Sequence, residues 1–200
     1  MNTKHFSPLP ISFKDMFNMQ RDLMFRYRPE FKDLKFDVDN PRTQELLKER
    51  AWCITEELTE MLEAYYKSNE EGPEHVWEEA IDAFNFFIEF LYMLGYSPEE
   101  HPLLFDQLDK YPVPKKNANE IEGATLDIIY YLGMVCNLFK ARKWRESQYL
   151  VDIFMLRRRV KTLWQSFLIL FLAFEWTEKD ICDHYSLKYQ VNNFRLQSNY

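Results

Sequence analysis

Apolar side chains recur every three or four positions along most of this chain, which is the spacing of one face of an α-helix. Proline, glycine and short polar stretches interrupt this pattern at intervals. No segment shows the alternation of apolar and polar residues that is typical of a half-buried strand. The pattern therefore predicts an all-α protein, a bundle of about six helices.

Capping residues and helix breakers set the expected ends of these helices. Ser12 can cap the first helix, and Pro29 forbids its continuation. Asn40 and Pro41 supply an N-cap and a first helical residue for the second helix. The Pro-rich segment 101–117 is expected to be a loop or the edge of an insertion. The predicted helices span about residues 12–28, 40–66, 73–95, 120–143, 147–174 and 177 onward.

Glycine is scarce in this chain. Only four of its 200 residues are glycines, and they stand far apart. They can form neither the G-x-G-x-x-G turn of a Rossmann fold nor the G-x-x-x-x-G-K-[ST] phosphate loop, so both kinds of nucleotide site are excluded. Any phosphate group that the chain binds must therefore be held in another way.

Charge and cysteine content indicate which partners the protein does not bind and in which compartment it is expected. The formal net charge of −7 argues against binding to nucleic acid or an anionic membrane. The three cysteines form no C-x-x-C pair and are odd in number, as is typical of a reducing compartment. Residues 1–10 lack the apolar core of a signal peptide, and the most apolar run, 167–174, is too short to span a membrane. We expect a soluble protein of the cytoplasm, or of the host cytoplasm if a phage encodes it.

Two pairs of acidic residues lie beside apolar positions of the predicted helices. Glu57 and Glu60 border the apolar stripe of the second helix. Glu79 and Asp82 share a face of the third helix, which is apolar nearly all round. Unpaired carboxylates inside a bundle are strongly unfavourable, and a divalent cation removes this conflict. Oxygen ligands without His or Cys favour Mg²⁺ or Mn²⁺. The alternative is a solvated edge for the first pair and Arg or Lys partners for the second.

The last helix carries a stripe of polar side chains that could bind phosphate oxygens. Its members follow the spacing i, i+3, i+7 and i+10 on one helical face, and they are Tyr185, Lys188, Asn192 and Arg195. Lysine, amide and guanidinium groups together suit an array of phosphate oxygens. The alternative is an ordinary solvated face. On the first helix, Gln20 interrupts an apolar face and can pair with a nucleobase edge, or it is a glutamine at the boundary of the core.

These motifs, in this order, resemble the dimeric dUTPase family together with the phage dCTP/dUTP pyrophosphatases, within the all-α NTP pyrophosphatases that include MazG-like proteins. The residues that carry the resemblance are Met19-Gln20, Glu57-x-x-Glu60, Glu79-x-x-Asp82 followed by Phe84-Asn85-Phe86, and Tyr185-x-x-Lys188-x-x-x-Asn192-x-x-Arg195 ending in Tyr200. The resemblance covers about residues 12–96 and 163–200. The segment of about 98–160 resembles a family-variable insertion, so that residues 1–200 form a single domain.

The resemblance implies a role for each motif. The ligands of Mg²⁺ would be Glu57, Glu60, Glu79 and Asp82. The phosphate groups would be bound by Lys188, Asn192, Arg195 and Tyr200. The nucleobase would be contacted by Gln20 and Asn85. The implied reaction is cleavage between the α- and β-phosphates of a deoxynucleoside triphosphate, in a homodimer. A glutamate must then take a proton from the attacking water, and either Glu57 or Glu60 is expected to act as this catalytic base.

At three positions that concern recognition of the nucleobase, the sequence differs from the uracil-specific members of this family. Asn85 stands where uracil-specific members usually have His, Leu23 stands where they often have Asn, and Leu196 replaces their usual Gln. The expected substrate is therefore dUTP, with dCTP open as a second one. The alternatives are a MazG-like pyrophosphohydrolase of another deoxynucleotide and a non-catalytic helical protein that binds a partner.

Overall fold

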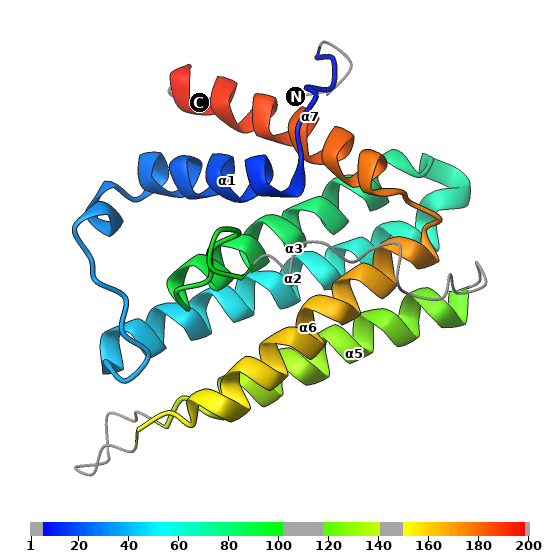
Figure 1. The fold of residues 1–200 in the computed structure, drawn as a ribbon. Helices are drawn as coiled ribbons and strands as arrows, with labels where there is room; N and C mark the ends of the chain where they lie inside the picture. Colours follow the sequence, from blue (N-terminus) through cyan, green and yellow to red (C-terminus); the bar gives the residue numbers. More distant parts are fainter. Residues whose placement is uncertain (1–5, 102–117, 141–149, 199–200) are drawn as a thin grey trace.

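The computed structural model describes residues 6–101, 118–140 and 150–198. Within these ranges the protein is a bundle of six α-helices and one 3₁₀ helix, without a strand, as the periodicity predicted (Figure 1). The elements are α1 (Phe13–Tyr27), η2 (Pro29–Lys32), α2 (Pro41–Glu71), α3 (Glu74–Met93), α5 (Ala118–Cys136), α6 (Ile153–Ala173) and α7 (Glu178–Gln197). The all-α fold class is thus confirmed.

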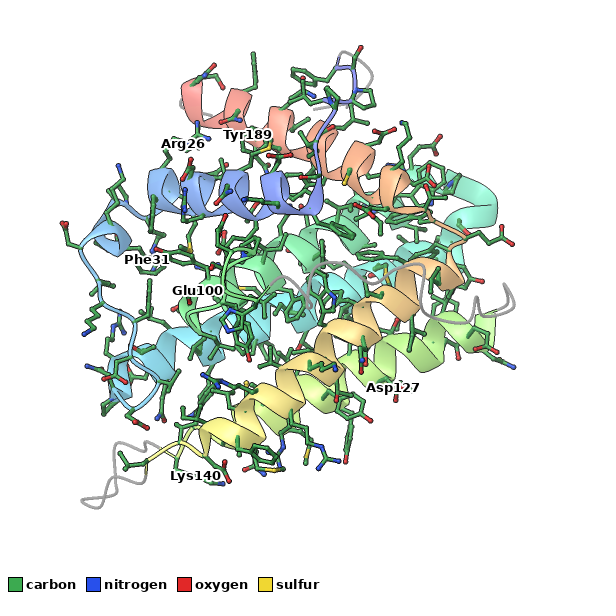
Figure 2. All side chains as sticks on the ribbon, viewed as in Figure 1. Arg26, Phe31, Glu100, Asp127, Lys140 and Tyr189 are labelled. Atoms are coloured by element: carbon green, nitrogen blue, oxygen red, sulfur yellow. The ribbon has the colours of Figure 1, made fainter. Side chains whose placement is uncertain are left out.

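The helices are arranged around α3. α2 packs along α3, with which it forms a helical hairpin, and α5 packs along α6 (Figure 1). α1 and α7 lie side by side and both contact α3. Arg26 of α1 donates to the Tyr189 hydroxyl of α7 over 3.3 Å, and both residues are labelled in Figure 2. A helix that is apolar nearly all round is expected at the centre of a bundle, and α3 occupies that place.

Aromatic side chains fill the core between α3 and α6. The rings of Phe87 and Phe167 are stacked, with their centroids 4.5 Å apart and their planes at 10°. Phe84 meets Phe171 edge to face at 5.0 Å, and its ring lies 5.6 Å from that of Trp164. All of these side chains are buried. Each of them removes a large apolar area from water, which holds the two helices in register.

The predicted starts of α1 and α7 coincide with side-chain caps. Ser12 caps α1 as expected and forms a capping box with Asp15, and Thr177 forms one with Asp180 at the start of α7. α6 differs, because it begins at Ile153 and not at 147. Its N-cap is Asp152, whose carboxylate accepts from the Met155 amide. Position 147 itself lies outside the described residues.

Two helix ends also differ from the prediction. α2 continues to Glu71 and ends at Gly72, whose φ of 88° suits glycine. Nothing in the sequence between Tyr66 and Gly72 breaks a helix, so the earlier end was wrong. α5 ends at Cys136, well before position 143, and residues 137–140 are not helical. No helix within the described ranges is long and apolar enough to cross a membrane.

The predicted insertion of about 98–160 contains α5 and the first residues of α6. α5 packs against both α2 and α6, so these residues are part of the bundle. Whether the segment varies among relatives stays a prediction.

Replacing Phe87 by Ala should lower the free energy of unfolding by about 3–5 kcal/mol, because a buried, stacked ring is lost and leaves a cavity. Phe154 on α6 is 75% exposed and provides the control. Phe154→Ala should change the free energy of unfolding by less than about 0.5 kcal/mol. Urea denaturation followed by circular dichroism measures both values, and equal effects of the two substitutions would contradict this view of the core.

Candidate active site

The α2–α3 hairpin brings three carboxylates together. Glu57 of α2 and Glu79 and Asp82 of α3 each offer an oxygen within 4.8 Å of the other two. Glu79 is buried, and the other two are partly buried. One member of the first acidic pair, Glu57, meets both members of the second because α2 and α3 lie side by side (Figure 1).

This cluster of three carboxylates is electrostatically unfavourable without a cation. Burial, a hydrogen bond with Glu79 and the charge of Asp82 together raise the pKa of Glu57 to about 8. Burial also raises the pKa of Asp82, although the charge of Lys188 opposes this effect. The ligand set consists of carboxylate oxygens, which are the donors that hard divalent cations prefer. The cluster therefore fits a bound Mg²⁺ or Mn²⁺.

Glu60 lies at the edge of this cluster. It is exposed on α2, about one turn after Glu57, and its charge contributes to the raised pKa of Glu57. It does not belong to the group of oxygens within 4.8 Å. Its role as a metal ligand or as a catalytic base remains a prediction.

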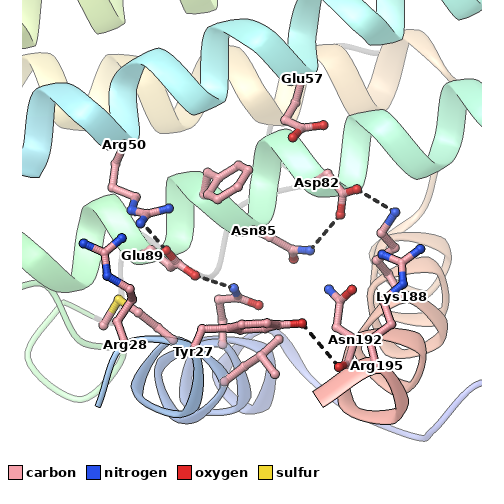
Figure 3. Close-up of a pocket in the computed structure, with 14 residues that line it drawn as sticks. Tyr27, Arg28, Arg50, Glu57, Asp82, Asn85, Glu89, Lys188, Asn192 and Arg195 are labelled. Atoms are coloured by element: carbon pink, nitrogen blue, oxygen red, sulfur yellow. Dashed lines mark hydrogen bonds and ion pairs between the residues drawn. The ribbon is translucent and has the colours of Figure 1, made fainter. Parts of the chain in front are cut away.

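The polar stripe of α7 faces the carboxylates across a cavity. Lys188 Nζ lies 2.6 Å from Asp82 Oδ2. Burial lowers the pKa of Lys188, but the charge and hydrogen bond of Asp82 outweigh this effect, and the net shift is upward. Asn192 and Arg195 line the same cavity, whereas Tyr200 lies outside the described residues. α7 thus presents cationic and amide donors beside the acidic cluster (Figure 3).

The cavity has a volume of about 400 Å³ and lies between α1, α2, α3 and α7. The predicted site residues on its wall are Gln20, Glu57, Asp82, Asn85, Lys188, Asn192 and Arg195. Apolar side chains complete it, among them Leu23, Met24 and Phe86. A cavity thus lies between the helices, where the site is expected, and its use as an active site stays a prediction.

A buried polar network closes the end of the cavity that is distant from the carboxylate cluster. Gln20 Nε2 donates to Glu89 Oε1 over 2.9 Å, and Arg50 Nε lies 3.4 Å from Glu89 Oε2. The donation to Glu89 orients the glutamine amide, because an ionised carboxylate only accepts hydrogen bonds. The Tyr185 hydroxyl lies 3.2 Å from Gln20 Oε1 and 3.1 Å from the Met16 carbonyl oxygen. Tyr185 therefore belongs to the core and not to the polar face on which the spacing placed it.

Sequence reasoning missed Glu89 and Arg50. The signal for Glu89 was the one that identified Glu79 and Asp82, an acidic residue on an almost wholly apolar helix. Its burial raises its pKa, while Arg50 and Gln20 oppose this effect. The Arg50 guanidinium lies 5.3 Å from the centroid of the Phe86 ring, which helps to hold it in place.

Only one of the two polar atoms of the Asn85 side chain has a hydrogen-bond partner within the described residues. Its Nδ2 donates to Asp82 Oδ1 over 3.4 Å, while its buried Oδ1 has no hydrogen-bond partner within the described part of the chain. Buried polar atoms in native proteins are nearly always paired. An unpaired acceptor on the wall of a cavity is open to a donor from a ligand or from water.

Together, the fold and the site define an all-α protein in which a cluster of carboxylates and a set of cationic and amide side chains meet at one cavity. This combination suits the hydrolysis of a nucleotide. The family model for dUTPases matches residues 12–200. The chain therefore belongs to the all-α dUTPase family, as its motifs indicated. No curated protein and no solved structure shows a significant match to it.

The raised pKa of Glu57 has a consequence for the stability of the metal-free protein. Between pH 4.5 and about 8 the folded state retains a proton that the unfolded state has lost, so the free energy of unfolding falls as the pH rises. Glu57→Gln should remove this dependence and stabilise the protein at pH 8.5 but not at pH 5. Denaturation at both pH values in the presence of EDTA measures the difference. Glu56→Gln, at an exposed neighbouring position, is the control, and the same pH dependence in both variants would contradict the assignment.

Proposed function

We propose that this chain is a Mg²⁺-dependent pyrophosphatase that hydrolyses dUTP to dUMP and pyrophosphate, and that dCTP is a second substrate. The observation that carries this proposal is the ion pair between Lys188 and Asp82. It brings the cationic and amide donors of α7, which could bind phosphate, next to the carboxylate cluster in one cavity. A triphosphate ester needs both groups, because the cation and the basic side chains divide its negative charge between them.

The proposed metal ligands are Glu57, Glu79 and Asp82, with Glu60 reaching the ion from the rim of the cluster. Mg²⁺ is proposed as the physiological cation, and Mn²⁺ has a similar ligand preference. When bound, the cation neutralises triphosphate charge and lowers the pKa of a water molecule.

The side chains of the site divide the remaining tasks. Lys188, Asn192 and Arg195, with Tyr200 at the end of the chain, hold the phosphate oxygens and orient the α-phosphate. Either Glu57 or Glu60 takes the proton of the attacking water. Cleavage of the bond between the α-phosphorus and the bridging oxygen then releases pyrophosphate.

The base is proposed to bind beyond the sugar, between Gln20 and Asn85. Leu23, Met24 and Phe86 provide apolar surface for a pyrimidine ring. The unpaired Oδ1 of Asn85 would accept a hydrogen bond from the ligand. Membership of the dUTPase family supports dUTP as the substrate, rather than a substrate of the MazG-like enzymes. The other alternative, a non-catalytic binding protein, would release no pyrophosphate.

We also propose that two copies of the chain associate in the cytoplasm, without nucleic acid. Large apolar side chains are exposed on the outer faces of α2 and α5, namely Trp52, Tyr66, Leu126 and Tyr130. Exposed apolar side chains of this size are typical of surfaces that become buried on association.

Asp82→Asn should abolish pyrophosphate release, because the substitution keeps the shape of the side chain but removes one charge from the cluster. A coupled assay for pyrophosphate with dUTP and Mg²⁺ measures the loss, and circular dichroism shows whether the helices persist. The control is Asp127→Asn, at an exposed position of α5 labelled in Figure 2. Unchanged turnover in Asp82→Asn would refute the metal assignment.

Arg195→Ala should raise KM for dUTP by about tenfold or more and change kcat less, because a charged hydrogen bond to phosphate is lost. Steady-state kinetics with dUTP and dCTP measure both constants. Arg158→Ala removes an exposed arginine of α6 and should leave KM unchanged. A selective loss of discrimination between the two bases, with KM for the preferred base unaffected, would contradict the phosphate role.

A further inference from the structure

Two buried acceptors line the cavity one helical turn apart on α3. Asn85 is 6% exposed and Glu89 is 7% exposed, and both lie on the cavity wall (Figure 3). Oδ1 of Asn85 has no partner within the described part of the chain. The Glu89 carboxylate accepts a hydrogen bond from Gln20 and forms an ion pair with Arg50. A carboxylate has about four acceptor sites, so it can accept further hydrogen bonds.

The neighbouring side chains fix which atoms face the ligand. Asn85 uses its Nδ2 on Asp82, so its carbonyl oxygen is the atom left for a ligand. Gln20 receives the Tyr185 hydroxyl on Oε1 and gives one Nε2 hydrogen to Glu89. The second Nε2 hydrogen of Gln20 remains as a donor. The wall therefore presents two acceptors with a donor beside them.

The positions of Asn85 and Glu89 along α3 place their acceptors at the level that the base of a bound nucleotide would reach. A helix rises 1.5 Å per residue, so Asn85 lies about 4.5 Å and Glu89 about 10.5 Å along the axis from Asp82 in the metal cluster. A nucleotide whose phosphates lie at Asp82 and that extends along α3 brings its base to the level of Asn85 and Glu89. The exocyclic group of a pyrimidine can then lie between the two acceptors.

We infer that Asn85 and Glu89 together bind the 4-amino group of a cytosine, and that dCTP is therefore preferred over dUTP. This inference rests on the proposed pyrophosphatase function. The amino group has two hydrogens for the two acceptors, and the adjacent ring nitrogen N3 accepts from Gln20. Uracil in the same position directs its O4 at two acceptors and its N3–H at a donor, so it is mismatched at both atoms.

Pyrophosphate release by the wild-type protein from dCTP, dUTP and N4-methyl-dCTP tests the inference without any mutation. We expect kcat/KM for dCTP to exceed that for dUTP by about tenfold or more, since unpaired polar groups disfavour the wrong base. The N4-methyl group removes one of the two donors, so kcat/KM should fall by about tenfold. A higher kcat/KM for dUTP than for dCTP, or full activity on N4-methyl-dCTP, would overturn the inference.

Glu89→Gln provides the matching variant, because it keeps the volume and replaces an acceptor by a group that can donate to O4. The ratio of kcat/KM for dCTP to that for dUTP should fall by about tenfold or more. Glu49→Gln is the control, because Glu49 Oε1 lies 3.8 Å from Arg50 but is exposed and outside the cavity. An equal loss for both substrates in Glu89→Gln would overturn the inference. Absence of pyrophosphate from every deoxynucleotide would instead refute the proposed function on which it rests.

Discussion

Repulsion among three carboxylates is the interaction on which the rest of this site depends. Glu57, Glu79 and Asp82 lie within 4.8 Å of one another in a partly buried place, where like charges are screened poorly. The packing of α2 against α3 enforces this proximity, and Lys188 from α7 offsets only part of the charge. The fold therefore holds an unfavourable arrangement that a bound divalent cation would relieve, and metal binding would then depend on the geometry of the two helices.

A second constraint follows from the shortage of glycine. Because the chain has four glycines and no phosphate loop, backbone amides cannot cradle a triphosphate in the usual way. In the proposed site, side chains on helices would take their place, because Lys188, Asn192 and Arg195 of α7 line the same cavity as Glu57 and Asp82. Such a site is held in position by helix packing, so the aromatic core around Phe87 and Phe167 also determines its geometry.

The sequence predicted the features that depend on local periodicity or on a spacing within one helix. The all-α class, the caps at Ser12 and Thr177 and the acids of α3 are of this kind. The end of α5 and the start of α6 were wrong, because apolar residues continue beyond the helices and the cap at Asp152 was overlooked. The network of Gln20, Arg50 and Glu89 could not be predicted, since it joins three helices through contacts that no spacing within one helix reveals.

The number of protons released when Mg²⁺ binds tests the central claim most directly. Glu57, with a pKa of about 8, is largely protonated at pH 7 in the metal-free protein, and it must lose this proton to become a ligand. Calorimetric titrations at pH 7 in two buffers of different ionisation enthalpy give this number. The account predicts the release of about one proton per bound cation, and a smaller release at pH 9. Binding without proton release at pH 7, or no binding at all, would contradict it.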